Sequence, residues 1–168
     1  MKNRIIIGIL LVLFTLPLNG LISSGLTGGT NYQMIGNDES FKEWWYSFGI
    51  LAELKFPVLP LSVRGDLCYS WYIKNITHVT SSDVNLILSA KYTLTPPLMP
   101  IDFYLGAGPG LHIYKVGEQE LENYFGAHIY SGLVIKMGMN IFAEAGFGMI
   151  FPEEGSWKQF NLKAGVMF

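Results

Sequence analysis

The sequence has few charged residues and a single cysteine. Charged residues make up 14% of its 168 positions, and the mean hydropathy of +0.32 is high for a soluble protein. Cys68 is the only cysteine, which excludes an internal disulfide bond. The net charge of −2 gives no indication of nucleic-acid binding. No linker or low-complexity tract divides the chain, so we expect one domain.

Beyond the N-terminus the sequence also lacks an apolar run long enough for a membrane-spanning helix. The N-terminus combines two basic residues with an apolar run over Ile5–Leu16, which predicts a secretory signal peptide over residues 1–20. Cleavage as late as Gly25 is also compatible with the small residues there, and an uncleaved membrane anchor is the alternative. We therefore expect residues 21–168 to form the mature domain.

What the sequence does have is alternation. In Trp157–Phe168, apolar residues occupy every second position, and polar or small residues occupy the positions between them. A period of two is typical of β-strands, and seven segments share it. A weaker segment, rich in glycine, serine and threonine, precedes them. The predicted strands are Leu21–Gln33, Trp44–Phe56, Leu61–Lys74, Asp83–Leu94, Ile101–Val116, Asn123–Ile135, Ile141–Phe151 and Trp157–Phe168.

Strand length and connections indicate a membrane barrel. Most predicted strands exceed the ~5–6 residues usual in globular proteins and reach the ~9–11 residues that a tilted transmembrane strand needs. Compact turns at Pro57–Pro60, Thr95–Pro100 and Lys136–Asn140 alternate with loops at Met34–Glu43, Asn75–Ser82, Gly117–Glu122 and Pro152–Ser156. Turns at one rim and loops at the other predict an all-β fold, an eight-stranded antiparallel up-and-down transmembrane β-barrel.

The two faces of the strands favour lipid outside the barrel. The polar face has few charges, and in Ile101–Val116 and Asn123–Ile135 glycine alternates with tyrosine, which suits a narrow interior. Aromatic residues gather towards strand ends, as they do at membrane interfaces. Towards the outer rim these are Trp44, Trp45, Trp71, Tyr72, Tyr114, Tyr124, Phe125, Phe151 and Trp157, and towards the inner rim they are Phe56, Tyr92, Phe103, Phe142 and Phe168.

Three features carry a resemblance to a known family. The stretches Phe103–Leu111 (FYLGAGPGL) and Phe142–Gly148 (FAEAGFG), together with the terminal Phe168, resemble the small OmpA/OmpX-like outer-membrane β-barrel superfamily. The resemblance covers about Leu21–Phe168. It implies a bacterial outer-membrane location among lipid and lipopolysaccharide, with Phe168 as the signal that the outer-membrane assembly machinery reads.

Charged residues on the predicted lumen face are balanced in sign. A buried unpaired charge costs several kcal/mol, whereas a hydrogen-bonded ion pair is tolerated. If Phe56 faces Leu61 across the turn, Glu53 lies opposite Arg64. We therefore expect a salt-bridged, largely closed lumen, and a narrow conduit gated by these pairs is the alternative. The lumen charges are Glu53, Lys55, Arg64, Asp66, Lys91, Asp102, Glu144 and Lys163.

Neither a catalytic site nor a metal site is predicted, and no cofactor is expected. His112 and His128 fall on the lumen faces of neighbouring strands, but a metal needs three or four convergent ligands. His128, Ser131 and Glu144 are the only set that suggests a hydrolase such as the lipid A deacylase barrels. Alternation places Ser131 towards lipid, away from the other two, so a nucleophile beside a base is not formed.

Acidic residues gather in the predicted outer loops. Carboxylates there could share Ca²⁺ or Mg²⁺, which also bind lipopolysaccharide phosphates, and the simpler interpretation is a solvated charged rim. These residues are Asp38, Glu39, Glu43, Glu118, Glu120, Glu122, Glu153 and Glu154.

From the sequence we expect a monomeric, non-enzymatic outer-membrane protein with a role in envelope integrity or surface interaction. A small pore is one alternative. A soluble periplasmic barrel of the lipocalin type, with the apolar face turned inward, is the other.

Overall fold

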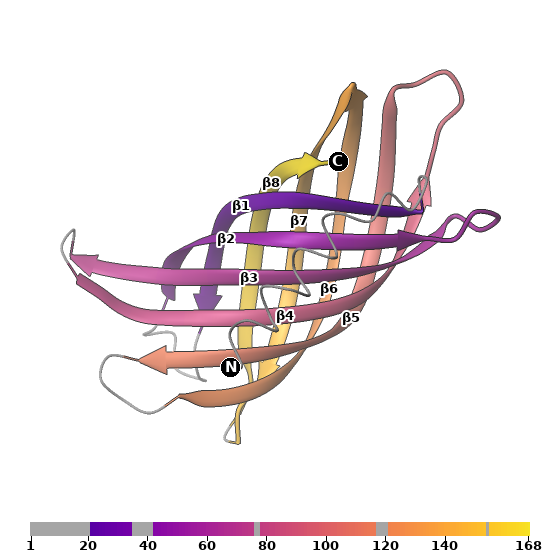
Figure 1. Ribbon diagram of the computed structural model, residues 1–168. Coiled ribbons are helices and arrows are strands. Elements are labelled where there is room, and N and C mark those ends of the chain that lie inside the picture. The colour runs from indigo at the N-terminus through magenta and orange to yellow at the C-terminus, as the bar shows by residue number, and fades with distance from the viewer. Residues whose placement is uncertain (1–20, 35–41, 76–77, 117–120, 154) are drawn as a thin grey trace, which may run out of the picture.

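The protein forms a closed antiparallel barrel (Figure 1). The structure, a computed structural model, describes residues 21–34, 42–75, 78–116, 121–153 and 155–168, and the predicted signal peptide lies outside these ranges. The strands are β1 (Ile22–Met34), β2 (Lys42–Lys55), β3 (Leu61–Asn75), β4 (His78–Leu94), β5 (Ile101–Val116), β6 (Glu122–Met137), β7 (Met139–Phe151) and β8 (Trp157–Met167). Each strand pairs with the next along the chain, and β8 pairs with β1, which confirms the predicted topology. The described residues contain no apolar helix long enough to cross a bilayer.

The two ends of the barrel differ. One end, which we call the turn end, carries the connections 56–60, 95–100 and 138, together with the start of β1 and the end of β8. The opposite end, which we call the loop end, carries the remaining connections between strands. At the turn end Phe168 extends the ladder beyond β8, because its backbone N–H donates to the carbonyl of Ser24 at 2.7 Å.

The strands are staggered around the barrel. A path through paired residues leaves β1 at Ile22, crosses to Leu54 and continues around the sheet until it returns to β1 at Tyr32, ten residues further along. Such a stagger accompanies the tilt that closure requires. Closure pairs the backbone groups of the wall without leaving a sheet edge, which is the condition for crossing hydrocarbon.

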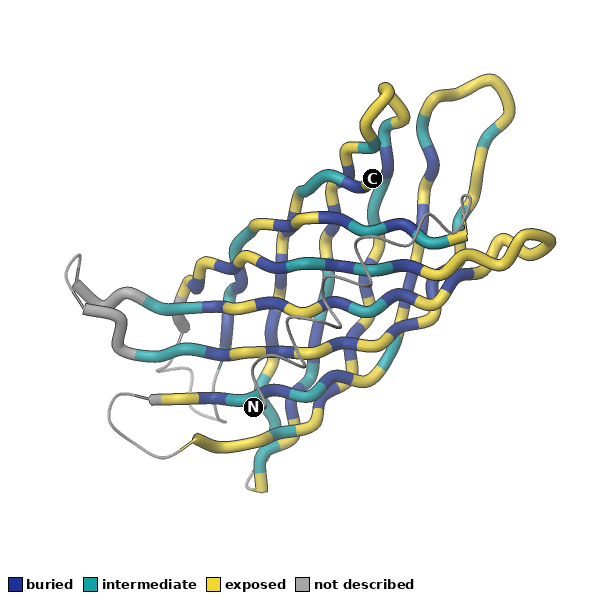
Figure 2. The backbone as a smooth tube through the Cα atoms, in the orientation of Figure 1, coloured by how far each residue is buried: buried dark blue, intermediate teal, exposed yellow. Residues whose placement is uncertain are grey.

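Burial alternates along every strand, as the banded tube in Figure 2 shows. On β8, Gln159 and Asn161 point inward and are buried, whereas Phe160 and Leu162 point outward and are about half exposed. The same pattern puts large apolar side chains over the outer wall, including Phe48, Leu67, Leu86, Leu105, Ile129 and Phe160. A soluble barrel has the reverse arrangement, so the lipocalin-type alternative is not favoured.

Glycine and tyrosine fill the interior in complementary positions. Gly106 pairs with Tyr130 across β5 and β6, and Tyr104 pairs with Gly132. A Cβ atom at Gly106 would lie 2.2 Å from Cζ of Tyr130, and one at Gly132 would lie 2.5 Å from Cζ of Tyr104. Each glycine therefore provides the space that the tyrosine on the neighbouring strand occupies, which explains the alternation seen in the sequence.

Two segments differ from the sequence prediction. β4 begins at His78 rather than Asp83, so most of the predicted loop at Asn75–Ser82 is strand. The pairing of β3 with β4 is irregular near Ile73. The polar and β-branched residues there were interpreted as a loop, but without glycine or proline they are compatible with a strand. The predicted turn at Lys136–Asn140 is tighter than expected, because Gly138 adopts a positive φ of 76°.

The predicted aromatic girdles divide into two groups. Trp44, Phe125 and Phe151 are exposed on the outer wall, as a membrane girdle requires. Trp45 and Tyr114, however, are buried inside the loop-end half of the barrel with Ile150, and Tyr72, Tyr124 and Trp157 pack against them. Phe142 is buried inside as well. The prediction that all these residues lie at the interfaces is wrong, because the inward positions need large side chains to fill the lumen.

Because the apolar side chains point outward, a charge introduced among them should strongly lower the stability of the barrel in lipid. Leu88 is exposed on β4, within the band of outward apolar side chains. Leu88→Arg should lower the free energy of unfolding in lipid vesicles by ~2–4 kcal/mol if the site lies near mid-bilayer. Urea titration of the refolded protein measures this. The matched control is Leu98→Arg in the turn between β4 and β5, where the side chain is fully exposed. Equal effects of the two substitutions would contradict the assignment.

Candidate functional site

The most unusual feature of the barrel is its charged interior. Seven of the predicted lumen charges are buried there, and the eighth, Lys55, is not. Lys55 is the last residue of β2 and lies exposed at the turn end, where it lines a pocket with Glu53 and Asp102, so it is at the mouth of the lumen rather than within it. The seven buried residues are Glu53, Arg64, Asp66, Lys91, Asp102, Glu144 and Lys163.

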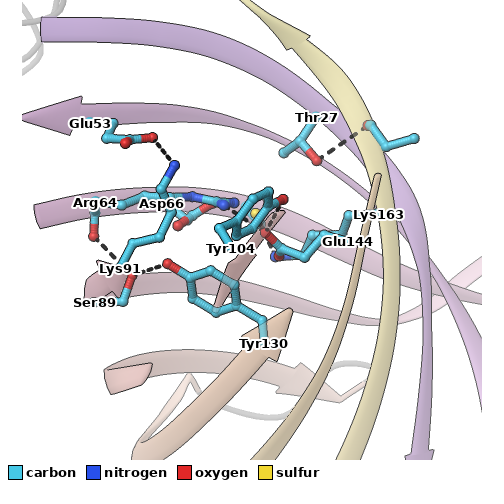
Figure 3. Close-up of polar contacts among 12 residues, drawn as sticks. Thr27, Glu53, Arg64, Asp66, Ser89, Lys91, Tyr104, Tyr130, Glu144 and Lys163 are labelled. Atoms are coloured by element: carbon cyan, nitrogen blue, oxygen red, sulfur yellow. Dashed lines mark hydrogen bonds and ion pairs between the residues drawn. The ribbon is translucent and has the colours of Figure 1, made fainter. Parts of the chain in front are cut away.

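Arg64 lies across the lumen (Figure 3). Its Nη2 donates to Oδ1 of Asp66 on the same strand at 2.6 Å. Its Nη1 donates to Oε2 of Glu144 at 2.6 Å, and the hydroxyl of Tyr104 donates to the same oxygen at 3.1 Å. Arg64 is on β3 and Glu144 is on β7, which lie on opposite sides of an eight-stranded barrel. The guanidinium therefore joins opposite walls and obstructs the space between them.

Aromatic rings cover the same guanidinium. Its Cζ lies 4.9 Å from the ring centroid of Tyr130 and 5.6 Å from that of Phe142. Tyr130 is itself fixed by a hydrogen bond of 2.7 Å between its hydroxyl and Ser89. Cation–π contacts of a desolvated arginine are worth about 2 kcal/mol. Arg64 is thus held in one position by carboxylates at its edges and by rings over its faces.

The other two interior lysines have different kinds of partner. Lys91 forms an ion pair with Glu53, and its ammonium lies 4.8 Å from the ring centroid of Tyr104. Lys163 donates to the sulfur of Cys68 at 3.6 Å. Glu53 lies opposite Arg64 in the ladder, as the sequence predicted, yet each bonds to another partner. Position in the ladder therefore does not determine which charges pair.

A second polar group fills the loop-end half. His112 Nδ1 lies 3.0 Å from Oδ2 of Asp83, and its Nε2 lies 2.9 Å from Nε2 of His128. The distance between the two Nε2 atoms is that of a hydrogen bond, so one proton lies between the rings. Within the described ranges, no three histidine, cysteine, aspartate or glutamate side chains gather as a metal site requires. Asp83 was missed as a lumen residue because β4 was predicted to begin there.

Aromatic side chains close the space above these histidines. Tyr114 stacks on His112 with a centroid distance of 5.8 Å, and it contacts Trp157 edge-on at 5.2 Å. Trp45 contacts Tyr114 from β2 at 6.2 Å. The loop-end half of the lumen is therefore filled by this polar group and by rings, and the turn-end half by ion pairs among apolar and aromatic side chains.

The residues that suggested a hydrolase are not brought together. Ser131 is exposed on the outer wall, whereas His128 and Glu144 are buried in the lumen. Glu144 is bonded to Arg64 and Tyr104, and His128 is bonded to His112. This trio does not form a nucleophile with an adjacent base.

Part of the predicted acidic rim is described. Glu122 and Glu153 are exposed at the loop end. Asp38, Glu39, Glu118, Glu120 and Glu154 lie outside the described residues, and so does the side chain of Glu43.

Comparison with known proteins shows the fold. No protein-family model matches the chain, and no curated protein is similar to it in sequence. The Neisserial surface protein A structure matches with 17% identity and a TM-score of 0.69, over 87% of this chain and 94% of that one. The N-terminal barrel of Pseudomonas aeruginosa OprF matches with 17% identity and a TM-score of 0.54, over 87% and 97%. The outer membrane enzyme PagL matches with 15% identity and a TM-score of 0.55, over 86% and 97%.

The chain thus has the fold of the OmpA/OmpX-like outer-membrane barrels, and its wall is apolar where such a barrel meets lipid. PagL is an enzyme, so the fold by itself does not decide between catalytic and non-catalytic roles.

The interior network predicts an asymmetric response to substitution. Arg64→Met leaves the carboxylates of Asp66 and Glu144 without their shared cation, and the free energy of unfolding should fall by ~3–5 kcal/mol. Urea titration in lipid vesicles measures the change. Lys136→Met is the comparison: the side chains of Lys136 and Asp102 are 46% and 13% exposed, so water can partly replace the lysine and the loss should be clearly smaller than for Arg64→Met. Similar losses in the two variants would contradict the network as drawn.

Proposed function

We propose that the protein is a monomeric, non-enzymatic outer-membrane barrel with a closed lumen, which serves envelope integrity or surface interaction. The observation that carries this proposal is the position of Arg64, bonded to Asp66 on its own strand and to Glu144 on the opposite wall. A conduit for ions needs a continuous path of water, and this side chain stands in that path.

Two separate layers support a closed lumen. Around Arg64, separating a buried charge from its partners costs ~3–5 kcal/mol, which opposes transient opening. In the loop-end half, Trp45 and Tyr114 are almost completely buried. An ion would have to disturb both layers to pass, so a small pore is the less favoured role.

The arrangement of polar side chains supports a non-catalytic role. The candidate nucleophile Ser131 faces outward, whereas His112 and His128 face inward. Both imidazoles are engaged by each other, and His112 is also engaged by Asp83. PagL shares the fold, but its activity is not carried over by the fold alone.

We place the turn end in the periplasm and the loop end outside the cell. Short turns are periplasmic in barrels of this type, and longer loops are extracellular. Phe168, exposed at the turn end, would present the signal that the assembly machinery reads. Residues 1–20 would be removed as a signal peptide, because cleavage after Gly25 would remove residues of β1 that pair with β2.

The surroundings of the barrel follow from this placement. The outer wall would contact outer-membrane lipid and lipopolysaccharide. The acidic rim at the loop end, of which Glu122 and Glu153 are described, could share Ca²⁺ or Mg²⁺ with lipopolysaccharide phosphates, and an organic cation would compete with these metals for those two carboxylates. Nothing in the net charge of −2 supports a nucleic-acid partner.

A closed lumen predicts the absence of conductance. The refolded protein, inserted into a planar bilayer at neutral pH, should give no steady single-channel steps, while a porin in the same bilayer serves as the positive control. Steady steps from the wild type that change in size with Arg64→Ala, and that disappear when the protein is boiled, would replace this proposal by the small-pore alternative.

A further inference from the structure

A pocket opens at the loop end beside the aromatic cluster. Its volume is about 490 Å³. Its lining comes from the start of β6, the connection after β7 and the start of β8, and consists of Glu122, Asn123, Tyr124, Pro152, Glu153 and Trp157. None of the other roles described above uses this pocket as a whole.

Two aromatic rings form one part of the lining. The centroids of Tyr124 and Trp157 are 5.0 Å apart, with an interplanar angle of 68°. Both rings pack on Tyr114, which is buried beneath them with centroid distances of 5.9 Å and 5.2 Å. Tyr124 and Trp157 are only half-buried, so the rings are fixed from inside the barrel while part of their surface stays open to the pocket.

Two carboxylates form the other part. The hydroxyl of Tyr124 donates to Oε2 of Glu122, and Glu153 is exposed beside it. No basic side chain belongs to the lining as described. The nearest lysines along the chain, Lys115 and Lys158, are exposed at positions that alternate with the inward residues of β5 and β8, so they lie on the outer wall. The lining therefore has an uncompensated charge of two carboxylates.

We infer that this pocket binds an organic ammonium ion. Such a cation is attracted to the faces of tryptophan and tyrosine rings and donates charge-assisted hydrogen bonds to carboxylates. The two negative charges repel phosphates and sulfates. Ca²⁺ takes six to eight oxygen ligands and Mg²⁺ keeps most of its water, so neither gains from the rings. A neutral sugar would stack on the rings and donate hydroxyl hydrogen bonds to the carboxylates, but it would leave their two negative charges uncompensated.

The ammonium group has two possible sources, a free polyamine or a lysine side chain on a partner protein. The pocket is defined by its own residues, and it does not depend on whether the lumen conducts. The inference rests on the proposed function in one respect: the extracellular position of the loop end means that the ligand comes from outside the cell. Binding to purified protein and conductance can therefore fail independently of each other.

The test uses the full chain refolded in detergent micelles. Spermidine represents a free polyamine, N-acetyl-lysine methylamide represents a lysine side chain, and Mg²⁺ represents a bare divalent cation. Calorimetry gives each Kd, and the NMR signal of the Trp157 indole N–H reports whether the ligand reaches the pocket. We expect saturable binding of at least one amine with a shift of that signal, and which amine binds distinguishes the two sources.

Variants separate the rings from the charges. Trp157→Leu should weaken amine binding at least about fivefold, which corresponds to one good cation–π contact. Glu153→Gln should weaken it by a similar factor, and Trp157→Phe, which keeps a ring, should weaken it less than Trp157→Leu. Trp44→Leu is the matched control, because Trp44 is exposed at the same end of the barrel on the outer wall. It should leave binding unchanged.

Three results would overturn the inference. These are the absence of saturable amine binding to the folded wild type, equal binding by wild type and the Trp157 variants, and Mg²⁺ binding that matches the amines and displaces them. Each variant is first checked for the shift in gel migration between unboiled and boiled samples. If Trp157→Leu does not fold, Trp157→Phe and Glu153→Gln carry the comparison.

Discussion

Closure of the sheet between β1 and β8 is the constraint on which the rest of the structure depends. A wall surrounded by hydrocarbon must satisfy its backbone hydrogen bonds within itself, and only a closed barrel of strands does so. With eight strands, closure fixes an interior barely wide enough for side chains. Every inward residue must then fit against its neighbours in the lumen, which is why glycine on one strand pairs with tyrosine on the next at Gly106 and Tyr130.

The narrow interior also decides how charge is held. Arg64 reaches both Asp66 and Glu144, and the rings of Tyr130 and Phe142 cover its faces. In a wide barrel the same residues would face water and conduct ions. In this one the charges serve as the packed core, and the apolar residues that fill the core of a soluble protein are on the outside.

The sequence predicted the fold well because alternation depends on neighbours along the chain. β5 has the same bounds in prediction and structure, and Glu53 lies opposite Arg64 as the turn implied. The partners of these charges were not predictable, because they depend on the stagger and radius of the whole barrel. The start of β4 was not predicted because a polar strand end resembles a loop, and for the same reason Asp83 was not predicted as a lumen residue. Alternation placed Tyr114 on the lumen face, but the inward role of Trp45 was missed because an aromatic residue near a strand end suits either face.

The central claim is that the charged interior is a fixed core rather than a hydrated conduit. Hydrogen exchange of the Arg64 Nε–H, followed by NMR on protein with ¹⁵N-labelled arginine, tests it most directly, with Arg4 absent from protein that begins at residue 21. We expect a resolved signal that exchanges with water far more slowly than a free arginine side chain, because this N–H donates to Asp66 at 3.1 Å in a buried site. Exchange at the rate of a free arginine would show that water reaches the lumen, and it would contradict the account.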